Sequence, residues 1–435
     1  MQERHTKISL IMNLIDEIVS YSNLHKAYKQ VVSNKGAAGV DGMQVSELWD
    51  FLGQNRETIR LSILSGNYHP QAVKGIEIPK SSGGKRLLGI PSVIDRMIQQ
   101  AIQQVLYVIF NREFSTYSYG FRRGKSATQA VRQALSYVNS GRHYVVDIDL
   151  SKFFDRVNHD YLMSLISRKV SDKMLLKLIR RYLQADIMIN GVQSRRKEGT
   201  PQGSPLSPLL SNILLNELDK ELAQRGHKFV RYADDFSVYV NTKRSATRVM
   251  QSLTKFIENK LKLKINESKS SVRYAGHMEL LGYGIYRTRK QDFALKVSAS
   301  SWNSFKRKCK QLTRKTKPIN ILTRTNRLRL YGQGWINYFR YAKIGTRLKR
   351  LDSWLGSRLR YCIFKTWKRV RTRIRKLKSL GVPEPLAIKW GLNQKGGWHL
   401  VHTPIFTTTL TVEKLKQQGF KPMAEIYYKL NPSDI

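Results

Sequence analysis

The stretch FVRYADDFSVYV, residues 229–240, constrains the fold most, because it sets adjacent carboxylates between two apolar and aromatic runs. Apolar runs with period-two alternation around a short polar step predict two antiparallel strands and a tight turn. The turn would lift Asp234 and Asp235 out of the apolar strands. Aspartate favours turns through hydrogen bonds to nearby backbone, so this pair by itself indicates a turn rather than a site.

A second source of carboxylates changes this interpretation. The stretch HYVVDIDL, residues 143–150, has the β-branched content and alternation of a strand, and Asp147 and Asp149 lie near its end. Strand geometry alone does not choose between these two aspartates. Three carboxylates at neighbouring strand ends repel one another unless cations neutralise them, and Mg²⁺ takes carboxylate oxygens while leaving positions for substrate phosphates. Two such ions support in-line nucleotidyl transfer.

The charge of the chain indicates its class of partner. The 435 residues include 77 Lys and Arg against 31 Asp and Glu, a formal net charge of +46. Self-repulsion of this size favours a bound polyanion, and nucleic acid gains affinity as neutralised phosphates release counterions. No stretch approaches the roughly 20 apolar residues of a membrane span, and the N-terminus is not typical of a signal peptide. Cys309 and Cys362 lie outside any CxxC or metal-ligand pattern, which predicts packing roles in a reduced compartment. We expect a cytoplasmic protein without membrane contact.

Strands and helices alternate over the first two thirds of the chain. Strand patterns surround a Ser-Gly turn at 76–91 and recur near 271–286. Helical periodicity is found at 93–110, 125–139, 161–184, 206–225 and 245–261. This order predicts an α+β domain over residues 1–288.

Basic helical segments dominate from residue 302 to 380, and the break GVPEP at 381–385 then begins a small C-terminal module. A charge run alone is usually a solvated helix face. Here Trp354, Tyr361 and Trp367 are interleaved with the cations, and such a mixture is typical of surfaces that stack on bases or sugars. RNA or DNA contact is the favoured interpretation.

Motifs in a fixed order resemble those of one family. Three stretches resemble the palm motifs of reverse transcriptases: YADD at 232–235, DIDLSKFFDRVNHD at 147–160 and GTPQGSPLSPLLSNILLNELD at 199–219. Three more resemble the group II intron-encoded branch: NKGAAGVDG at 34–42, IPKSSGGKRLLGIPSVIDR at 78–96 and YSYGFRRGKSATQA at 117–130. Two are similar to its maturase, or X, domain: GQGWINYF at 332–339 and LDSWLGSRLR at 351–360.

The resemblance implies a right-hand polymerase of the short, endonuclease-lacking type. Fingers and palm would occupy residues 1–288, an α-helical thumb/X domain 289–380, and a candidate DNA-binding module 381–435. The implied activity is RNA-directed DNA polymerisation, with dNTPs, from a DNA or RNA primer on an RNA template. The implied partners also include group II intron RNA, bound by a splicing maturase as a ribonucleoprotein, and target DNA for retrohoming. The implied cofactor is two Mg²⁺ ions, for which Mn²⁺ substitutes.

The resemblance also assigns the catalytic residues. Aligning FFDRVNH with the family motif selects Asp149 as the palm aspartate. Asp149, Asp234 and Asp235 would then hold the metal ions, with the Leu150 carbonyl as a further ligand. Lys269 matches a family lysine proposed to protonate the leaving pyrophosphate.

Substrate contacts are implied as well. Lys80 and Arg86 would grip the incoming triphosphate, although without the motif they indicate only an exposed basic hairpin. The Phe154 ring would occupy the space of a ribose 2′-OH and favour dNTPs; without the motif it would be a core residue. Gln202 would touch the nucleotide or template, and Gly203 would let the backbone approach the primer-template closely.

Two alternative hypotheses remain open from the sequence. One is a host-domesticated group II-like reverse transcriptase that serves DNA repair or defence. The other is a purely RNA-binding splicing factor with a decayed palm. The intact YADD motif, together with Asp149, Lys80 and Arg86, argues against decay, because a binding module does not need these residues.

Overall fold

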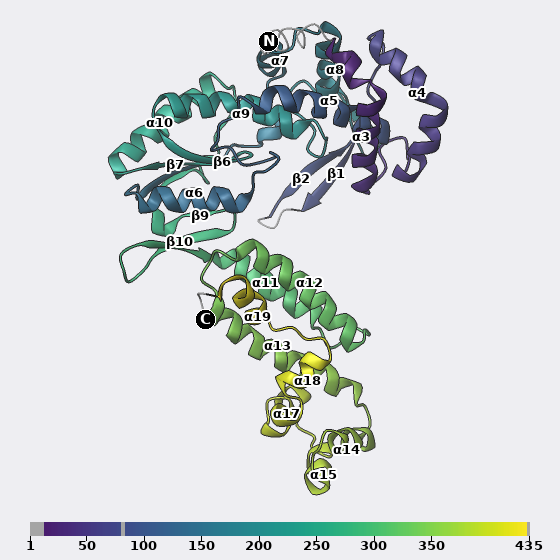
Figure 1. The fold of residues 1–435 in the computed structure, drawn as a ribbon, viewed down its shortest axis with the longest axis vertical. Coiled ribbons are helices and arrows are strands. Elements are labelled where there is room, and N and C mark those ends of the chain that lie inside the picture. Colours follow the sequence, from purple (N-terminus) through teal and green to yellow (C-terminus); the bar gives the residue numbers. More distant parts are fainter. Residues whose placement is uncertain (1–12, 80–82, 433–435) are drawn as a thin grey trace, which may run out of the picture. The chain divides into compact units, whose positions relative to one another are not determined.

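The computed structural model describes residues 13–79 and 83–432, and the chain divides into two compact units between Tyr274 and Ala275 (Figure 1). Helices combine with antiparallel sheets, as the predicted α+β fold requires. The division lies N-terminal to the predicted palm boundary at residue 288, and the three-domain assignment stays a prediction.

A four-stranded antiparallel sheet forms the palm-like part of the first unit, in the order β6-β7-β3-β8. Its strands are β3 (Tyr144–Ile148), β6 (Lys228–Tyr232), β7 (Asp235–Val240) and β8 (Ser271–Tyr274). Three helices pack on it: α6 (Ala127–Asn139), α9 (Ser207–Gln224) and α10 (Lys243–Asn259). Figure 1 shows α9 and α10 on one side of the sheet and α6 on the other. The three strands predicted at 143–150 and 229–240 are therefore confirmed as paired strands of one sheet.

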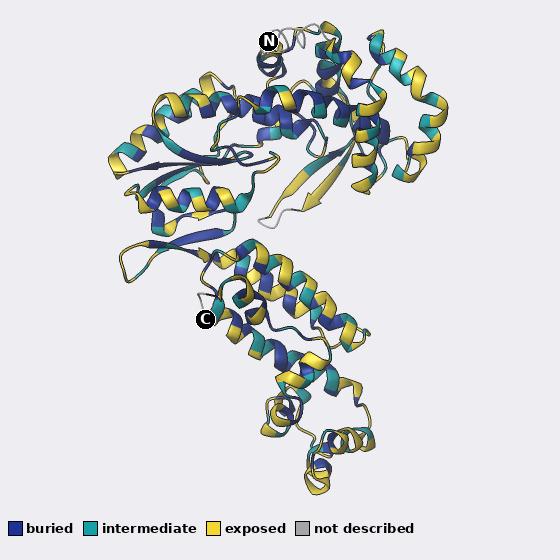
Figure 2. Ribbon diagram, viewed as in Figure 1, coloured by how far each residue is buried: buried dark blue, intermediate teal, exposed yellow. Residues whose placement is uncertain are grey.

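The core of this unit runs from the sheet into a helical region. Figure 2 shows buried residues concentrated in the palm strands, in α9 and in α5 (Val93–Asn111). Helix α5 is buried around most of its circumference, and its buried residues include the polar Asp95 and Gln99. Further helices surround it: α2 (Leu14–Ile18), α3 (Tyr21–Ser33), α4 (Leu48–Leu64), α7 (His159–Ser167) and α8 (Lys173–Gln184). The periodic run predicted at 161–184 is two helices, because the Asp172 carboxylate caps α8 by accepting from Leu175 N.

A second sheet of this unit has the order β2-β1-β4-β5. The predicted strand pair is confirmed as β1 (Val73–Pro79) and β2 (Lys85–Ile90), while residues 80–82 of its turn lie outside the described residues. The strands β4 (Ile187–Ile189) and β5 (Val192–Ser194) were not predicted, because three residues carry too little periodicity. Asn190 and Gly191, with φ of 50° and 84°, join them in a two-residue turn that an Asn-Gly pair favours.

The second unit begins with a three-stranded antiparallel sheet, in the order β11-β10-β9. Its strands are β9 (Glu279–Leu280), β10 (Tyr283–Arg287) and β11 (Phe293–Val297). Long helices follow as predicted: α11 (Ala299–Leu312), α12 (Ile321–Phe339), α13 (Gly345–Thr366) and α14 (Val370–Ser379). Five short helices complete it: α15 (Glu384–Gly391), α16 (Gly397–Leu400), α17 (Pro404–Thr409), α18 (Val412–Gln417) and α19 (Met423–Leu430). None of the helices in the described ranges is long and apolar enough to span a membrane.

The prediction that Trp367 of the second unit stacks on bases or sugars is wrong. Trp367 is only 6% exposed and packs in a core cluster with Phe364 and Phe406, so its ring is not available to a base. Cys309 and Cys362 are both buried and unpaired, which confirms their packing roles.

Candidate active site in the palm

The β6–β7 hairpin presents the two adjacent aspartates. Tyr232 pairs with Asp235, so Ala233 and Asp234 form a two-residue turn. Ala233 has a φ of 58°, in the left-handed region that costs a residue with a side chain about 1–2 kcal/mol. The surrounding structure must therefore hold this turn in place.

A buried guanidinium supports the turn. Arg231 is 0% exposed, and its Nε and Nη2 atoms donate to the Asp219 carboxylate oxygens of α9 at 2.8 and 2.6 Å. Its Nη1 donates to the Ala233 carbonyl at 3.1 Å and to Asn212 Oδ1 at 2.9 Å. Asn212 Nδ2 in turn donates to the Gly120 carbonyl at 3.0 Å. This network ties α9, β6 and the turn together.

The backbone of residues 117–120 lies against the same turn. Tyr119 N donates to the Arg231 carbonyl at 2.8 Å, and Arg231 N donates to the Tyr117 carbonyl at 3.0 Å. A Cβ on Gly120 would lie 2.2 Å from Ala233 N, so only glycine permits this approach. Arg231, Asp219 and Gly120 were not predicted from the sequence as functional residues. The available signal was a charged residue inside an apolar strand, which requires a buried partner.

The structure distinguishes the two aspartates of the neighbouring strand. Asp147 lies within β3, and its carboxylate accepts from Ser237 Oγ of β7 at 2.5 Å. Asp149 follows the end of β3, and its Oδ2 lies 3.6 Å from the exposed Lys269 Nζ. Asp147 is thus engaged inside the sheet, whereas Asp149 lies beyond its end beside the predicted lysine. This geometry favours the choice that the family motif makes.

The Leu150 carbonyl takes no part in the backbone hydrogen bonds to the neighbouring segment, residues 264–266. Leu150 forms an antiparallel bridge with Ile265, but the hydrogen bonds run from Asn266 N to the Asp149 carbonyl at 2.8 Å and from Ser151 N to the Lys264 carbonyl at 2.8 Å. In such a non-hydrogen-bonded pair, the carbonyl of Leu150 points away from the neighbouring segment. It is therefore geometrically suited to a further ligand role.

Burial and neighbouring negative charges both raise the pKa values of the hairpin aspartates. Loss of solvation raises the pKa of Asp234, and the Asp149 charge raises it further, while Arg86 of β2 acts in the opposite direction. Loss of solvation, followed by the charges of Asp234 and Asp149, raises the pKa of Asp235 to about 6. A nearby cation would therefore stabilise the charged forms of these carboxylates.

The donor chemistry fits a hard divalent cation. Carboxylate and carbonyl oxygens are the ligands that Mg²⁺ prefers, and it binds through one or two carboxylates together with substrate phosphates. In the described ranges, no three His, Cys, Asp or Glu side chains are already gathered closely enough to hold a metal ion. The aspartates and the Leu150 carbonyl are therefore ligands of the type that Mg²⁺ prefers. A bound cation would also stabilise the charged forms of Asp234 and Asp235, whose pKa values are raised.

A cavity of about 280 Å³ is lined by Phe154, Gln202 and Gly89 of β2 among others. Phe154 lies in a single 3-10 turn, half-buried, with its ring packed edge-on against Phe153. Gly89 N donates to the Gln202 carbonyl at 2.7 Å, which joins the two walls. The structure thus brings Phe154 and Gln202 to one cavity.

Three further residues were predicted to contact the substrate. Arg86 is exposed on β2, and Lys80 lies outside the described residues. Gly203 has a φ of 111°, and a Cβ there would lie 2.7 Å from the Gly89 carbonyl. The conformation and the contact with β2 therefore both require glycine at 203, whatever else approaches it.

Two family models match the chain. Residues 78–285 match reverse transcriptase (RNA-dependent DNA polymerase), and residues 302–381 match the group II intron, maturase-specific domain. Protein YkfC of Escherichia coli (strain K12) is 32% identical over 328 residues, which cover 66% of this chain and 86% of YkfC. The chain belongs to the group II intron reverse transcriptases. The predicted family is confirmed, and so is the predicted fold class.

This reverse transcriptase also resembles longer relatives. It is 29% identical over 325 residues to the group II intron-encoded protein LtrA of Lactococcus lactis subsp. cremoris, with 60% of this chain and 54% of LtrA covered. It therefore spans about half the length of that relative. Among solved structures, a chain of the partial Cas6-RT-Cas1–Cas2 complex is 26% identical with a TM-score of 0.37, covering 58% of this chain and 43% of that chain.

Proposed function

We propose that this reverse transcriptase extends a DNA or RNA primer on an RNA template by two-metal nucleotidyl transfer. The observation that carries the proposal is that Asp149, Asp234 and Asp235 lie at one edge of the palm sheet, where burial and then the charges of Asp234 and Asp149 raise the pKa of Asp235 to about 6. Three carboxylates held at one edge are suited to bind divalent cations, because Lys269 and Arg86 offset their charges only in part. A structural turn would not need them.

The three aspartates and the Leu150 carbonyl would hold two Mg²⁺ ions. When bound, these ions would activate the primer 3′-hydroxyl and stabilise the leaving pyrophosphate. Lys269, whose Nζ lies 3.6 Å from Asp149 Oδ2, is positioned to hold a proton near the same edge. Its role as the acid for pyrophosphate is part of this proposal.

The residues of the neighbouring strands and loops would bind the nucleotide. Arg86 and Lys80 belong to the segment around the β1–β2 turn and would contact the triphosphate as cations. Phe154 and Gln202 line one cavity with β2, which supports roles for the ring against the ribose and for the amide against the base or template. Gly203 would keep the backbone close to the primer-template.

The maturase role is the second part of the proposal. Residues 302–381 match the maturase-specific domain, and the helices there are rich in Lys and Arg. Intron RNA in a ribonucleoprotein is the partner that this domain supports, and target DNA is the partner that mobility requires. Relatives named for group II introns support the inference of intron RNA as a partner.

Primer extension on an RNA template with dNTPs and Mg²⁺ tests the polymerase. Asp234→Asn should lower extension about a hundredfold or more, the usual cost of losing one group that stabilises transition-state charge. Asp50→Asn, an exposed aspartate on α4, is the matched control and should retain full extension. Wild-type protein that fails to extend any primer, while still binding intron RNA, would instead indicate the RNA-binding splicing factor.

A further inference from the structure

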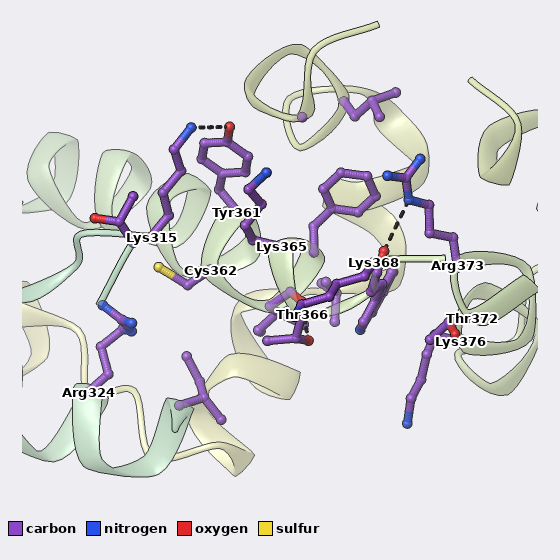
Figure 3. Close-up of a pocket in the computed structure, with 18 of the residues that line it drawn as sticks. Lys315, Arg324, Tyr361, Cys362, Lys365, Thr366, Lys368, Thr372, Arg373 and Lys376 are labelled. Carbon is purple, nitrogen blue, oxygen red and sulfur yellow. Dashed lines mark hydrogen bonds between the residues drawn. The ribbon is translucent and has the colours of Figure 1, made fainter. Parts of the chain in front are cut away.

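The second unit contains a large pocket, shown in Figure 3. Its volume is about 1320 Å³, and four segments form its walls: the 315–321 loop, the end of α13, helix α14 and the 393–397 loop. Small-molecule sites usually measure about 300–1,000 Å³. The pocket is therefore large enough for a stretch of polymer rather than a single small ligand.

The charge of this pocket has one sign. Each wall contributes exposed lysines, among them Lys317, Lys365, Lys376 and Lys395, and none of the described lining residues is Asp or Glu. The ion pairs described for this unit are Lys378 with Glu384 and Lys416 with Glu425, and none involves a pocket lysine. Cations converging from four segments without acids repel one another, so the pocket favours a polyanion.

Two of the pocket's cations are held in place before any ligand arrives. Lys315 Nζ donates to Tyr361 Oη at 2.6 Å and lies 4.4 Å from the ring centroid. Arg373 Nε donates to the Trp367 carbonyl at 3.1 Å, and its guanidinium lies 5.1 Å from the centroid of the Phe364 ring. Figure 3 shows both hydrogen bonds at the pocket wall. Cations that are already ordered lose less entropy on binding.

A buried arginine also fixes the loop that carries Lys315 and Lys317. Arg324 is 3% exposed and donates to the carbonyls of Leu312, Arg314 and Lys317 at 3.1, 2.8 and 2.9 Å. This side chain satisfies three loop carbonyls at once and so defines the loop's conformation. The wall is thus built, rather than a chance gathering of surface lysines.

The polar side chains between the cations indicate which kind of nucleic acid the pocket would bind. Thr316, Thr366, Thr372, Asn393 and Gln394 line the same pocket and offer hydroxyls and amides that donate and accept. RNA differs from DNA by a 2′-hydroxyl that does the same, and specific RNA recognition mostly targets unpaired strands. A duplex presents its two backbones on a convex surface, which a concave pocket walled on four sides does not match.

We propose that this pocket binds a single-stranded segment of RNA, an inference that rests on the proposed function because it specifies where the second unit contacts RNA. Residues 393–397, with Leu410 and Gln418, line the pocket but lie C-terminal to the maturase match at 302–381. The C-terminal module, predicted as a DNA-binding candidate, therefore completes an RNA-binding pocket together with the maturase domain.

Lysine footprinting on the full-length chain tests the pocket without any substitution. Amine labelling is compared with and without an oligouridylate of about ten nucleotides, a typical length for single-strand sites. Lys317, Lys365, Lys376 and Lys395 should be protected by RNA. Exposed lysines of the same unit outside the pocket should label equally in both samples: Lys308, Lys389 and Lys429. Equal protection of both groups, or of neither, overturns the proposal.

Binding measurements on two matched variants test the same point by charge. The pocket variant is Lys317→Gln/Lys365→Gln/Lys376→Gln, and the control is Lys308→Gln/Lys389→Gln/Lys429→Gln. Each phosphate contact adds about 0.7 to the salt slope for a single strand, so the pocket variant should lower the slope by about 2 and the control should not. The same loss in both variants would mean that general charge, not the pocket, binds the strand.

Two competitors and one parallel assay complete the test. The competitors are oligothymidylate and an RNA duplex of equal length, each compared with unlabelled oligouridylate. The assignment to single-stranded RNA is overturned if either competitor displaces the labelled oligouridylate with the same efficiency as unlabelled oligouridylate. Wild-type primer extension is measured in parallel. Extension without pocket protection refutes the pocket alone, whereas protection without extension refutes the polymerase alone.

Discussion

The buried pair of Arg231 and Asp219 gives the most demanding test of how the aspartate turn is held. Their side chains are 0% and 1% exposed, and the shorter of their two contacts is 2.6 Å. Asp219→Ala would leave the Arg231 charge buried without a counter-ion, which typically costs about 3–5 kcal/mol. The bonds from Arg231 to Asn212 and Ala233 would remain, but neither partner is charged.

Hydrogen exchange on peptides covering residues 229–240 measures this loss locally. A destabilisation of about 3–5 kcal/mol corresponds to roughly two to three and a half decades of faster exchange, where exchange follows opening free energy. Peptides from α12 in the second unit are the internal reference and should exchange as before. An acceleration of less than about tenfold in the 229–240 peptides would refute the argument, because it would mean that the buried charge has another partner.

A double variant separates stability from positioning. Arg231→Met/Asp219→Leu removes both charges, and apolar replacement of a buried ion pair is often neutral. Protection in the β6–β7 peptides should therefore recover most of the loss seen in Asp219→Ala. Primer extension should stay low, since the Ala233 carbonyl has lost the guanidinium that fixes the turn. Recovery of full extension would show that Arg231 contributes stability alone.

Three further predictions concern the same site. Burial and neighbouring charges raise the pKa of Asp235 from 3.8 to about 6, so the folded state binds this proton more tightly and ionisation destabilises it as the pH rises from about 4 to 6. Asp235→Asn should therefore raise the melting temperature in chelator near pH 7.5 but not near pH 4, while lowering primer extension; an unchanged melt at both pH values would contradict this. Phe154→Ala should raise rNTP incorporation relative to dNTP in single-nucleotide extension, and an unchanged ratio would remove the gate assignment. Gly120→Ala places a Cβ 2.2 Å from Ala233 N and should cost about 1–3 kcal/mol in unfolding and reduce extension, whereas wild-type stability and rate would mean that the contact relaxes freely.

Local periodicity was enough to predict most elements of the fold. The hairpin at 229–240, the buried helix α5 and the basic helices of the second unit all carry a clear period of two or of 3.6. The strands β4 and β5 escaped because they are short, and β4 pairs in parallel with β1, more than a hundred residues away. Such pairing depends on tertiary contact, which a local pattern does not encode.

The site was predictable in its charged residues but not in its supports. Alternation did not choose between Asp147 and Asp149, whereas in the structure Asp147 accepts from Ser237 within the sheet and Asp149 lies beyond the end of β3 beside Lys269. The ion pair of Arg231 with Asp219 joins a strand to a helix, so no local sequence pattern reveals it. Trp367 failed as a stacking residue because the interleaving of aromatics with cations does not show which face of a helix is buried.

Both candidate sites hold like charges together at an electrostatic cost that only a ligand can remove. At the palm edge the charges are carboxylates, and burial together with the charges of Asp234 and Asp149 raises the pKa of Asp235. In the second-unit pocket they are lysines and arginines without an acid among the described lining residues. A ligand that binds the folded state stabilises it in proportion to the logarithm of its concentration. Divalent cations without nucleic acid should therefore stabilise the first unit and not the second, as measured by the hydrogen exchange of peptides from each unit. Equal stabilisation of both units by divalent cations alone would mean that the palm carboxylates are not the cation site.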